Sequence, residues 1–267
     1  MFCSYNILVI PAKAGIQSGS PIGSGMTNVS LVLYHYAMAD NTIGKLIVIE
    51  GSDGSGKSTQ AALLLTYLEQ QNIPHSSLDF PQYDSFYGKI VAKFLRGEFG
   101  ELGNVSPYLA ALTFALDRYA VKDEIMKRLD RGEIIIANRY VTSNIAHQGA
   151  KFEDQAKRDA FISWLEELEY EVHGLPREDM VIHLQVPSEV TVKLTQMKDE
   201  RVYLQGKSDI QEQDRSHQNA TEMMYNILSQ QYKHWISLPC FQNGTMKSKE
   251  DIHQSIVRAL IKKGIVK

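Results

Sequence analysis

The stretch Lys45–Gln60, which reads KLIVIEGSDGSGKSTQ, decides the fold of this chain. It opens with an apolar run, Leu46–Ile49, which has the length and composition of a buried strand. It continues into Gly51–Ser58, which fits the pattern G-x-x-x-x-G-K-[ST] of a phosphate-binding loop between a strand and a helix. Glycines let such a loop point successive backbone N–H groups at an anion, and the next helix adds its positive end. The stretch therefore predicts a nucleotide-phosphate site.

Two side chains of this loop carry most of its chemistry. Lys57 can reach the β- and γ-phosphates of a nucleotide, and the Ser58 hydroxyl can ligate Mg²⁺. The alternative is a glycine- and serine-rich turn that matches by chance, and the flanking strand and helix argue against it. The predicted nucleotide-binding residues are Gly51, Ser52, Asp53, Gly54, Ser55, Gly56, Lys57, Ser58 and Thr59.

The composition of the chain excludes several classes of protein. Its 267 residues carry a net charge of −3, so no global charge favours a nucleic-acid or membrane partner. Its two cysteines, Cys3 and Cys240, cannot build a disulfide framework or a zinc site, which fits a reducing cytosol. No apolar run approaches the ~18 residues that a membrane-spanning helix needs. We therefore expect a cytoplasmic protein with no nucleic-acid or membrane partner.

The chain divides into a short leader and one domain. Residues 1–41 carry Gly, Ser and Pro clusters without a sustained period, and they lack the basic start and long apolar centre of a secretory signal. We interpret them as a disordered leader or a mis-assigned start, with a genuine extra arm as the alternative. In residues 42–267 strands alternate with amphipathic helices, which predicts an α/β fold with a mainly parallel central sheet flanked by helices. Expected strands cover 46–49, 75–80, 133–138, 180–186 and about 235–241, and expected helices 58–71, 86–95, 106–131, 189–197 and 248–261.

Six motifs occur together, in one order, from about Gly44 to the end of the chain. They are GSDGSGKST (51–59), DFPQYDSFYGK (79–89), FALDRYA (114–120), IIIANRYVTSNIAHQG (134–149), LPREDMVIHLQVP (175–187) and GKSDIQEQD (206–214). By this set, which covers roughly five-sixths of the chain, it resembles the bacterial thymidylate kinases of the P-loop nucleoside-monophosphate kinase group. The resemblance implies transfer of the γ-phosphoryl group of ATP to dTMP, a requirement for Mg²⁺, and a homodimer.

The resemblance also assigns residues to the acceptor nucleotide. Phe114 and Arg118 are four residues apart on one expected helix, so they share a face, and the family stacks this Phe on the base and reads the base with this Arg. The alternative is a core Phe with a solvated Arg. Asn144 and His147 match positions near the base edge and the deoxyribose, although a surface histidine is an open alternative. The implied acceptor-binding residues are Phe80, Phe114, Arg118, Arg139, Tyr140, Asn144, His147 and Gln148.

Further residues are implied in the transfer step. Arg139 ends a buried strand at the carboxyl edge, where ligands bind in open α/β sheets, and the family places it on the transferring phosphates. The family places Asp53 near the acceptor sugar, although a loop-capping Asp is the alternative. The charged segment 198–215 resembles the family's lid, and Gly54 stands where some members carry an Arg, so the catalytic cation should come from the lid. The implied catalytic residues are Lys57, Asp53, Arg139, Arg201 and Lys207.

Two positions depart from the family pattern. Asn138 precedes Arg139 where the family has an Asp, so this position supplies no negative charge to Mg²⁺. Glu212 or Asp53 must then supply more of the charge that holds the metal. The implied metal residues are Ser58 and Glu212. Tyr83 stands where a family Arg clamps the acceptor phosphate. Lys89, Arg118 and Arg139 are the candidates to replace it, and Pro81 is expected to hold the turn in an unusual peptide geometry.

Other functions remain open from the sequence alone. The nearest is a kinase for another nucleoside or nucleoside monophosphate. A GTP-binding switch would want an Asn-Lys-x-Asp motif, which the sequence lacks. A catalytically silent nucleotide-binding protein is kept open by Tyr83 and Asn138. The apolar helix face of Phe161, Trp164 and Leu168 fits either a dimer contact or packing within one subunit.

Overall fold

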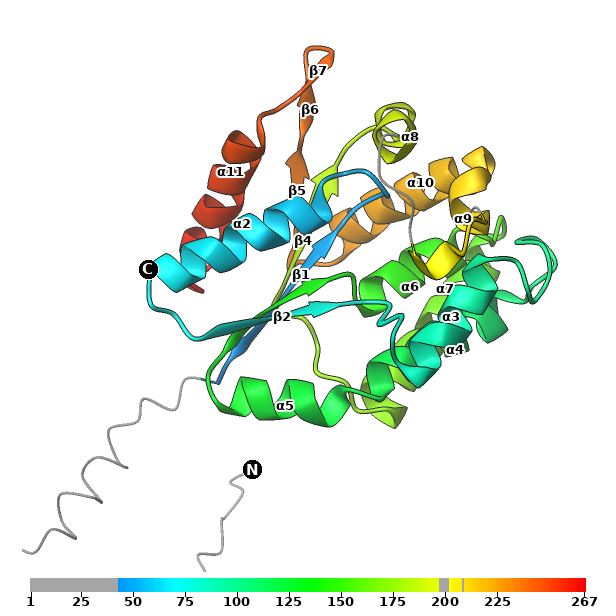
Figure 1. Cartoon of the computed structure of the whole chain (residues 1–267), viewed down its shortest axis with the longest axis horizontal. Coiled ribbons are helices and arrows are strands. Elements are labelled where there is room, and N and C mark those ends of the chain that lie inside the picture. The colour runs from blue at the N-terminus through cyan, green and yellow to red at the C-terminus, as the bar shows by residue number, and fades with distance from the viewer. Residues whose placement is uncertain (1–42, 197–201, 208) are drawn as a thin grey trace, which may run out of the picture. The chain divides into compact units, whose positions relative to one another are not determined.

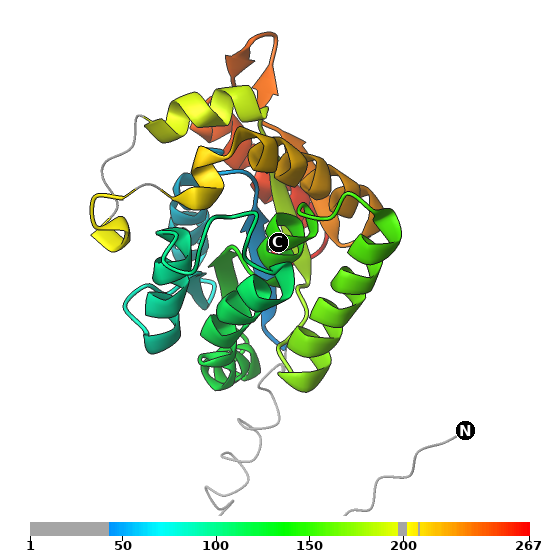
Figure 2. The ribbon, with the colours of Figure 1, turned by 90° about the vertical axis from the view of Figure 1, so that its right-hand side faces the viewer.

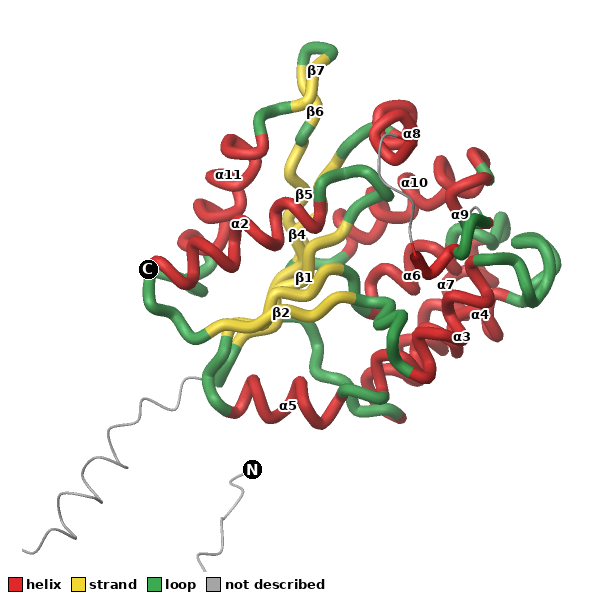
Figure 3. The backbone as a smooth tube through the Cα atoms, viewed as in Figure 1, coloured by secondary structure: helices red, strands yellow, loops and turns green. Residues whose placement is uncertain are grey.

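The computed structural model describes residues 43–196, 202–207 and 209–267. The predicted leader at 1–41 and the predicted lid residue Arg201 lie outside the described residues. Five parallel strands form the central sheet in the order β2-β3-β1-β4-β5. The sheet is drawn as arrows in Figure 1 and in yellow in Figure 3. Their bounds are β1 (Lys45–Glu50), β2 (His75–Asp79), β3 (Ile134–Asn138), β4 (Met180–Gln185) and β5 (Trp235–Pro239). A small antiparallel pair, β6 (Phe241–Gln242) and β7 (Thr245–Met246), follows β5.

Strand β1 is the centre of the sheet because its apolar run is buried on both faces. Ile47 pairs in register with Ile136 of β3 on one side and with Met180 of β4 on the other. All four residues from Leu46 to Ile49 are fully buried. A continuous apolar run of this kind is stable only where helices cover both faces of the sheet.

Helices cover both faces of the sheet, in the arrangement that Figures 1 and 2 show from two sides. On one face, α2 (Lys57–Gln70) and α11 (Lys249–Lys262) pack their apolar residues against Ile47 and Ile49. On the other, residues of five helices pack with Leu46 and Val48 in a second cluster. These helices are α4 (Pro107–Tyr119), α5 (Lys122–Asp130), α6 (Val141–Gly149), α7 (Gln155–Glu166) and α10 (Arg215–Gln231). The remaining elements are α3 (Phe86–Leu95), the π-helix η1 (Glu167–Val172), α8 (Ser188–Gln196), the 3₁₀ helix η2 (Val202–Leu204) and α9 (Ile210–Gln213).

The predicted α/β class with a mainly parallel sheet is confirmed, but one predicted helix is wrong. The expected helix over 106–131 is two helices, because α4 ends at Tyr119 and α5 begins at Lys122. The partly buried Val121 lies at this break and packs against the core. The break lets Ile125 and Leu129 of α5 join the same core cluster, with exposures of 0% and 7%.

The apolar face of α7 packs within the chain. Phe161 is fully buried, and Trp164 and Leu168 pack against the same cluster. The ring of Tyr108 lies 4.7 Å from that of Trp164, edge to face. Packing within one subunit therefore accounts for this face. None of the helices in the described part of the chain is long and apolar enough to cross a membrane.

Candidate active site

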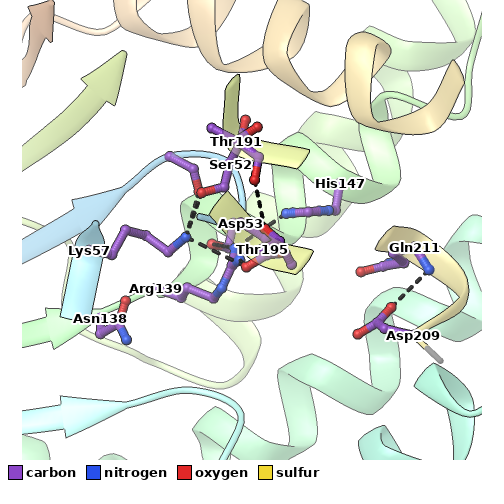
Figure 4. Close-up of polar contacts among 12 residues, drawn as sticks. Ser52, Asp53, Lys57, Asn138, Arg139, His147, Thr191, Thr195, Asp209 and Gln211 are labelled. Atoms are coloured by element: carbon purple, nitrogen blue, oxygen red, sulfur yellow. Dashed lines mark hydrogen bonds and ion pairs between the residues drawn. The ribbon is translucent and has the colours of Figure 1, made fainter. Parts of the chain in front are cut away.

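The phosphate-binding loop joins β1 to α2 at the carboxyl end of the central strand. Gly51, Gly54 and Gly56 have φ values of 144°, 89° and 95°, which side-chain-bearing residues rarely adopt, so the loop depends on glycine. Lys57 folds back over the loop: its Nζ donates to the carbonyl oxygens of Gly51 and Ser52 at 2.8 and 3.0 Å (Figure 4). The loop thus lies between a strand and a helix, as the motif predicts, and Lys57 is held against its backbone.

Asp53 and Arg139 form an ion pair beside this lysine (Figure 4). Arg139 follows β3 with a φ of 68°, and its Nη2 donates to Asp53 Oδ1 at 2.5 Å. The same carboxylate lies 3.8 Å from Lys57 Nζ. Burial alone would lower the pKa of Arg139, but the Asp53 carboxylate raises it well above its usual range. The carboxylate inside the loop is therefore compensated by two cations.

A buried carboxylate, Glu50, is linked to Arg139 by hydrogen bonds through Ser143. Glu50 is fully buried at the end of β1 and accepts hydrogen bonds from Thr142 Oγ1 and Ser143 Oγ, both at 2.6 Å, and from Tyr225 OH at 2.9 Å. Ser143 Oγ also accepts from Arg139 Nη1 at 3.1 Å. Because every link in this chain is a hydrogen bond, Glu50 orients the guanidinium through Ser143.

His147 is the other neighbour of Arg139. Its Nε2 lies 3.3 Å from Arg139 Nη1, so this nitrogen accepts and the proton of the neutral ring lies on Nδ1. Burial lowers the pKa of His147 well below its usual value, and Arg139 and His217 lower it further. His147 is therefore a partly buried histidine that lines the cleft, and its lowered pKa favours the neutral ring.

A cleft of about 580 Å³, counting the part open to solvent, lies beside the phosphate loop. Every acceptor-binding residue that the family resemblance implies lines the cleft: Phe80, Phe114, Arg118, Arg139, Tyr140, Asn144, His147 and Gln148. Asp53 lines it too, so the cleft opens onto the phosphate loop. Pro81 and Tyr83, at the position of the family's phosphate clamp, also line the cleft, as do Tyr203, Asp209 and Gln211 of the predicted lid segment. The structure adds three lining residues that the sequence analysis did not identify: Leu95, Asp117 and Ser143.

Two lining residues of the cleft, Arg118 and Asn144, are held by a buried carboxylate that sequence reasoning missed. Glu169 of η1 accepts from Arg118 Nε at 2.7 Å and from Arg118 Nη2. It also accepts from Asn144 Nδ2 at 3.1 Å, and the same Nδ2 donates to the Ala111 carbonyl at 3.0 Å. These two acceptors fix the amide, so that among the described residues Asn144 Oδ1 has no hydrogen-bond partner. An acceptor fixed by its amide and a guanidinium thus share one carboxylate partner, Glu169.

Glu169 keeps the buried Arg118 side chain charged. Glu169 is fully buried and Arg118 is 2% exposed. Burial alone would lower the pKa of Arg118, but the Glu169 carboxylate raises it above its usual range. One signal in the sequence pointed to Glu169: it lies four and eight residues after the buried Leu165 and Phe161, on the apolar face of the helix.

Tyr83, which stands where the family has a phosphate-clamping Arg, packs against another aromatic ring. Tyr83 stacks on Tyr203, with ring centroids 3.7 Å apart. The Phe80–Pro81 peptide bond before it is cis, the unusual geometry expected at Pro81. The turn is held by Asp117, which accepts from the Gln82 N–H at 2.8 Å. Of the three candidates to replace the missing arginine, Arg118 and Arg139 line the cleft, whereas Lys89 is exposed and is not among its described lining residues.

Described residues of the predicted lid segment line part of the cleft. Asp209 and Gln211, at the start of α9, lie across from Asp53 and Arg139 (Figure 4). Lys207, a predicted catalytic residue, is exposed. Glu212 lines a smaller hollow together with Ser52 and Asp53.

Helix α8 covers the phosphate loop at Gly54. A Cβ placed on Gly54 would lie 2.5 Å from the Thr191 carbonyl oxygen and 2.8 Å from Thr195 Oγ1, so no side chain fits. The absence of an arginine at this position, which the sequence shows, therefore has a steric reason.

Protein side chains near Ser58 supply only some of the oxygen ligands that a hard cation such as Mg²⁺ needs. Within residues 43–196, 202–207 and 209–267 no group of three or more His, Cys, Asp or Glu side chains is placed to hold a metal ion. Ser58 Oγ accepts from Asn138 Nδ2 at 3.3 Å. Any cation here would take most of its oxygen ligands from nucleotide phosphates and water, as Mg²⁺ does in kinases.

Comparison with known proteins agrees with this site. Residues 49–256 match the family model described as thymidylate kinase. The thymidylate kinase of Plasmodium falciparum is 29% identical over 229 residues, which cover 84% of this chain and 92% of that protein. The probable thymidylate kinase of Pyrococcus abyssi is 29% identical over 221 residues, covering 82% and 96%. The thymidylate kinase of Mycobacterium tuberculosis is 35% identical over 146 residues, covering 54% and 67%.

A solved structure has the same fold. The thymidylate kinase from Candida albicans superposes with a TM-score of 0.62 at 23% sequence identity, covering 83% of this chain and 92% of that one. The relatives come from distant organisms, so they support the family without selecting its bacterial branch. Because the family model spans both the phosphate loop and the cleft, this chain belongs to the thymidylate kinase family.

Proposed function

We propose that the chain transfers the γ-phosphoryl group of ATP to dTMP, giving dTDP and ADP. The observation that carries this proposal is the donor and acceptor pair Arg118 and Asn144, which Glu169 holds in place in a cleft that reaches Asp53 of the phosphate loop. Family membership supports the same reaction.

The base site matches thymine in its hydrogen-bonding pattern. The guanidinium of Arg118 donates to a carbonyl of the base, and Asn144 Oδ1 accepts from the neighbouring ring N–H. The ring of Phe114, held edge-on by Phe94 at 5.8 Å, stacks on the base. Cytosine presents an amino group and an unprotonated nitrogen at these two positions, so both contacts fail. An unpaired buried polar group costs about 1–3 kcal/mol, or about ten- to a hundredfold in selection.

The transfer step takes place between the cleft and the loop. The backbone amides of the loop and Lys57 bind the donor phosphates, and Arg139 lies where the two nucleotides meet. Asp53 holds Arg139 in place and lies near the acceptor sugar. We further propose that Arg201 and Lys207 of the lid at 198–215 supply the positive charge that an arginine at position 54 provides in some family members, because Gly54 leaves no room for such a side chain here.

The oxygen donors near the loop fit Mg²⁺, which is proposed as the cofactor together with ATP. Ser58 supplies a hydroxyl, and Glu212 a carboxylate near Ser52. When bound, Mg²⁺ neutralises charge on the phosphate oxygens. We also propose that residues 42–267 form one domain, that 1–41 are a dispensable leader, and that the protein is a cytoplasmic homodimer of the bacterial type.

A coupled ADP-release assay tests the proposed reaction. Purified protein is given ATP, Mg²⁺ and one acceptor at a time: dTMP, dUMP, dCMP, dGMP or thymidine. We expect dTMP to be the best acceptor and dUMP a poorer one, because dUMP lacks only the 5-methyl contact. A preference for dCMP, a purine monophosphate or thymidine would replace the proposal by another kinase activity. No ADP release with any acceptor would favour the silent nucleotide-binding protein.

A further inference from the structure

The carboxyl ends of β2 and β3 place Asp79 beside the residue that departs from the family pattern. Asp79 and Asn138 are register partners in the parallel pair, and both are the last residues of their strands. Asn138 Nδ2 donates to Asp79 Oδ1 at 2.5 Å and to Ser58 Oγ at 3.3 Å. One amide nitrogen therefore lies between a carboxylate oxygen and the hydroxyl of the phosphate loop.

This arrangement keeps a negative charge where the sequence alone indicates that one is lost. Asn138 is neutral, but the adjacent Asp79 is exposed and has its carboxylate at the same edge of the sheet. A carboxylate at the rim of a polyphosphate site repels the nucleotide unless a cation lies between them. Mg²⁺ is such a cation: it prefers oxygen ligands, keeps several waters, and uses only one or two carboxylates at nucleotide sites.

We infer that Asp79 supplies the carboxylate that holds the nucleotide-bound Mg²⁺ at Ser58, directly or through one of the metal's waters. Asp79 Oδ1 and Ser58 Oγ both lie within hydrogen-bonding distance of one nitrogen, so one hydrated cation reaches both. Asn138 acts as a positioning residue, because its amide orients the Asp79 carboxylate. The inference rests on the proposed use of a Mg²⁺–nucleotide complex, and it adds Asp79 to Glu212 and Asp53, the carboxylates already expected to compensate for Asn138.

The test measures metal binding without turnover. Mn²⁺ replaces Mg²⁺, and free Mn²⁺ is counted by electron paramagnetic resonance in the presence of protein and ADP. Asp79→Asn should weaken Mn²⁺ binding by about tenfold or more, the size of effect typical for residues that support a metal. Asp159→Asn, which removes an exposed carboxylate on α7, is the matched control and should bind Mn²⁺ like the parent protein.

A reciprocal exchange separates a metal role from a structural one. The double variant D79N/N138D moves the carboxylate to β3 and leaves an amide on β2, so it should recover most of the Mn²⁺ affinity that D79N loses. In the presence of EDTA, D79N should bind ADP at least as tightly as the parent protein, because the carboxylate that repels the phosphates without a metal is gone. The inference is overturned if D79N binds Mn²⁺ normally, or if the double variant binds it no better than D79N. Failure of the proposed dTMP reaction would appear separately, in the acceptor panel with the parent protein.

Discussion

Removal of Glu169 should destabilise the chain severely, because it leaves a buried guanidinium without its counter-charge. Arg118 is 2% exposed and donates hydrogen bonds to both oxygens of the fully buried Glu169. Breaking a buried pair from one side costs about 3–5 kcal/mol. A domain of this size loses about 2–4 °C of melting temperature per kcal/mol, so Glu169→Ala should melt about 6–20 °C lower.

The same π-helix contains a matched control. Glu171 is 69% exposed and lies 3.5 Å from the exposed Arg177. A surface pair of this kind contributes at most about 1 kcal/mol, so Glu171→Ala should melt within a few degrees of the parent protein. Thermal unfolding followed by circular dichroism, with calorimetry to check that unfolding is two-state, compares the two variants under identical conditions.

A double variant decides whether the lost stability comes from the unpaired charge. In Arg118→Leu/Glu169→Leu both charges are gone, so it should be more stable than Glu169→Leu alone. The milder Glu169→Gln should keep the fold but free the Asn144 amide to rotate, and the preference for dTMP over dCMP should fall about tenfold. The reasoning is refuted if Glu169→Ala melts like Glu171→Ala, or if Glu169→Gln keeps the full base preference.

Three further outcomes are expected. Lys57→Ala should lower turnover by orders of magnitude with the fold intact, because Lys57 follows the migrating phosphoryl group; a folded variant with near-normal turnover would remove Lys57 from the mechanism. Arg201→Ala and Lys207→Ala, alone and together, should lower turnover more than ATP affinity, and unchanged turnover in all three would place the missing cation elsewhere. Acidification should destabilise the protein through His183, whose pKa burial lowers from 6.5 to about 4. Below about pH 6.5 the unfolded chain binds a proton there that the folded chain does not, so stability falls by about 2 kcal/mol between pH 7 and 5. Urea titrations of His183→Gln should show a flatter pH profile by that amount, and a profile parallel to the parent's would contradict the assignment.

The part of the fold that sequence could predict is the part specified by local pattern. The apolar run Leu46–Ile49 and the glycines after it describe a strand and a loop whose physical requirements lie within the motif itself. Phe114 and Arg118 share a helix face because of their spacing alone, and both line the cleft. The resemblance to a known family added the remaining acceptor residues.

What sequence could not predict depends on contacts between distant segments. Glu169 meets Arg118 across 51 positions of the chain, and Asp79 meets Asn138 across 59. No local pattern encodes such pairs, because they follow from the order of the strands and the packing of α4 against α6 and η1. The break near Val121 was missed for a related reason: helix propensity continues through it, and tertiary packing ends the helix.

The contact between Gly54 and α8 has a consequence for how this protein can change over time. An arginine in the phosphate loop and a helix resting on that loop exclude each other here, since even a methyl group at Gly54 would collide with Thr191. A single substitution cannot therefore bring an arginine into the loop. The helix would have to move first, and in the proposed mechanism that step would disturb the lid before any gain in the loop was available. A lineage with this geometry should therefore retain its lid cations even while the surrounding lid sequence drifts.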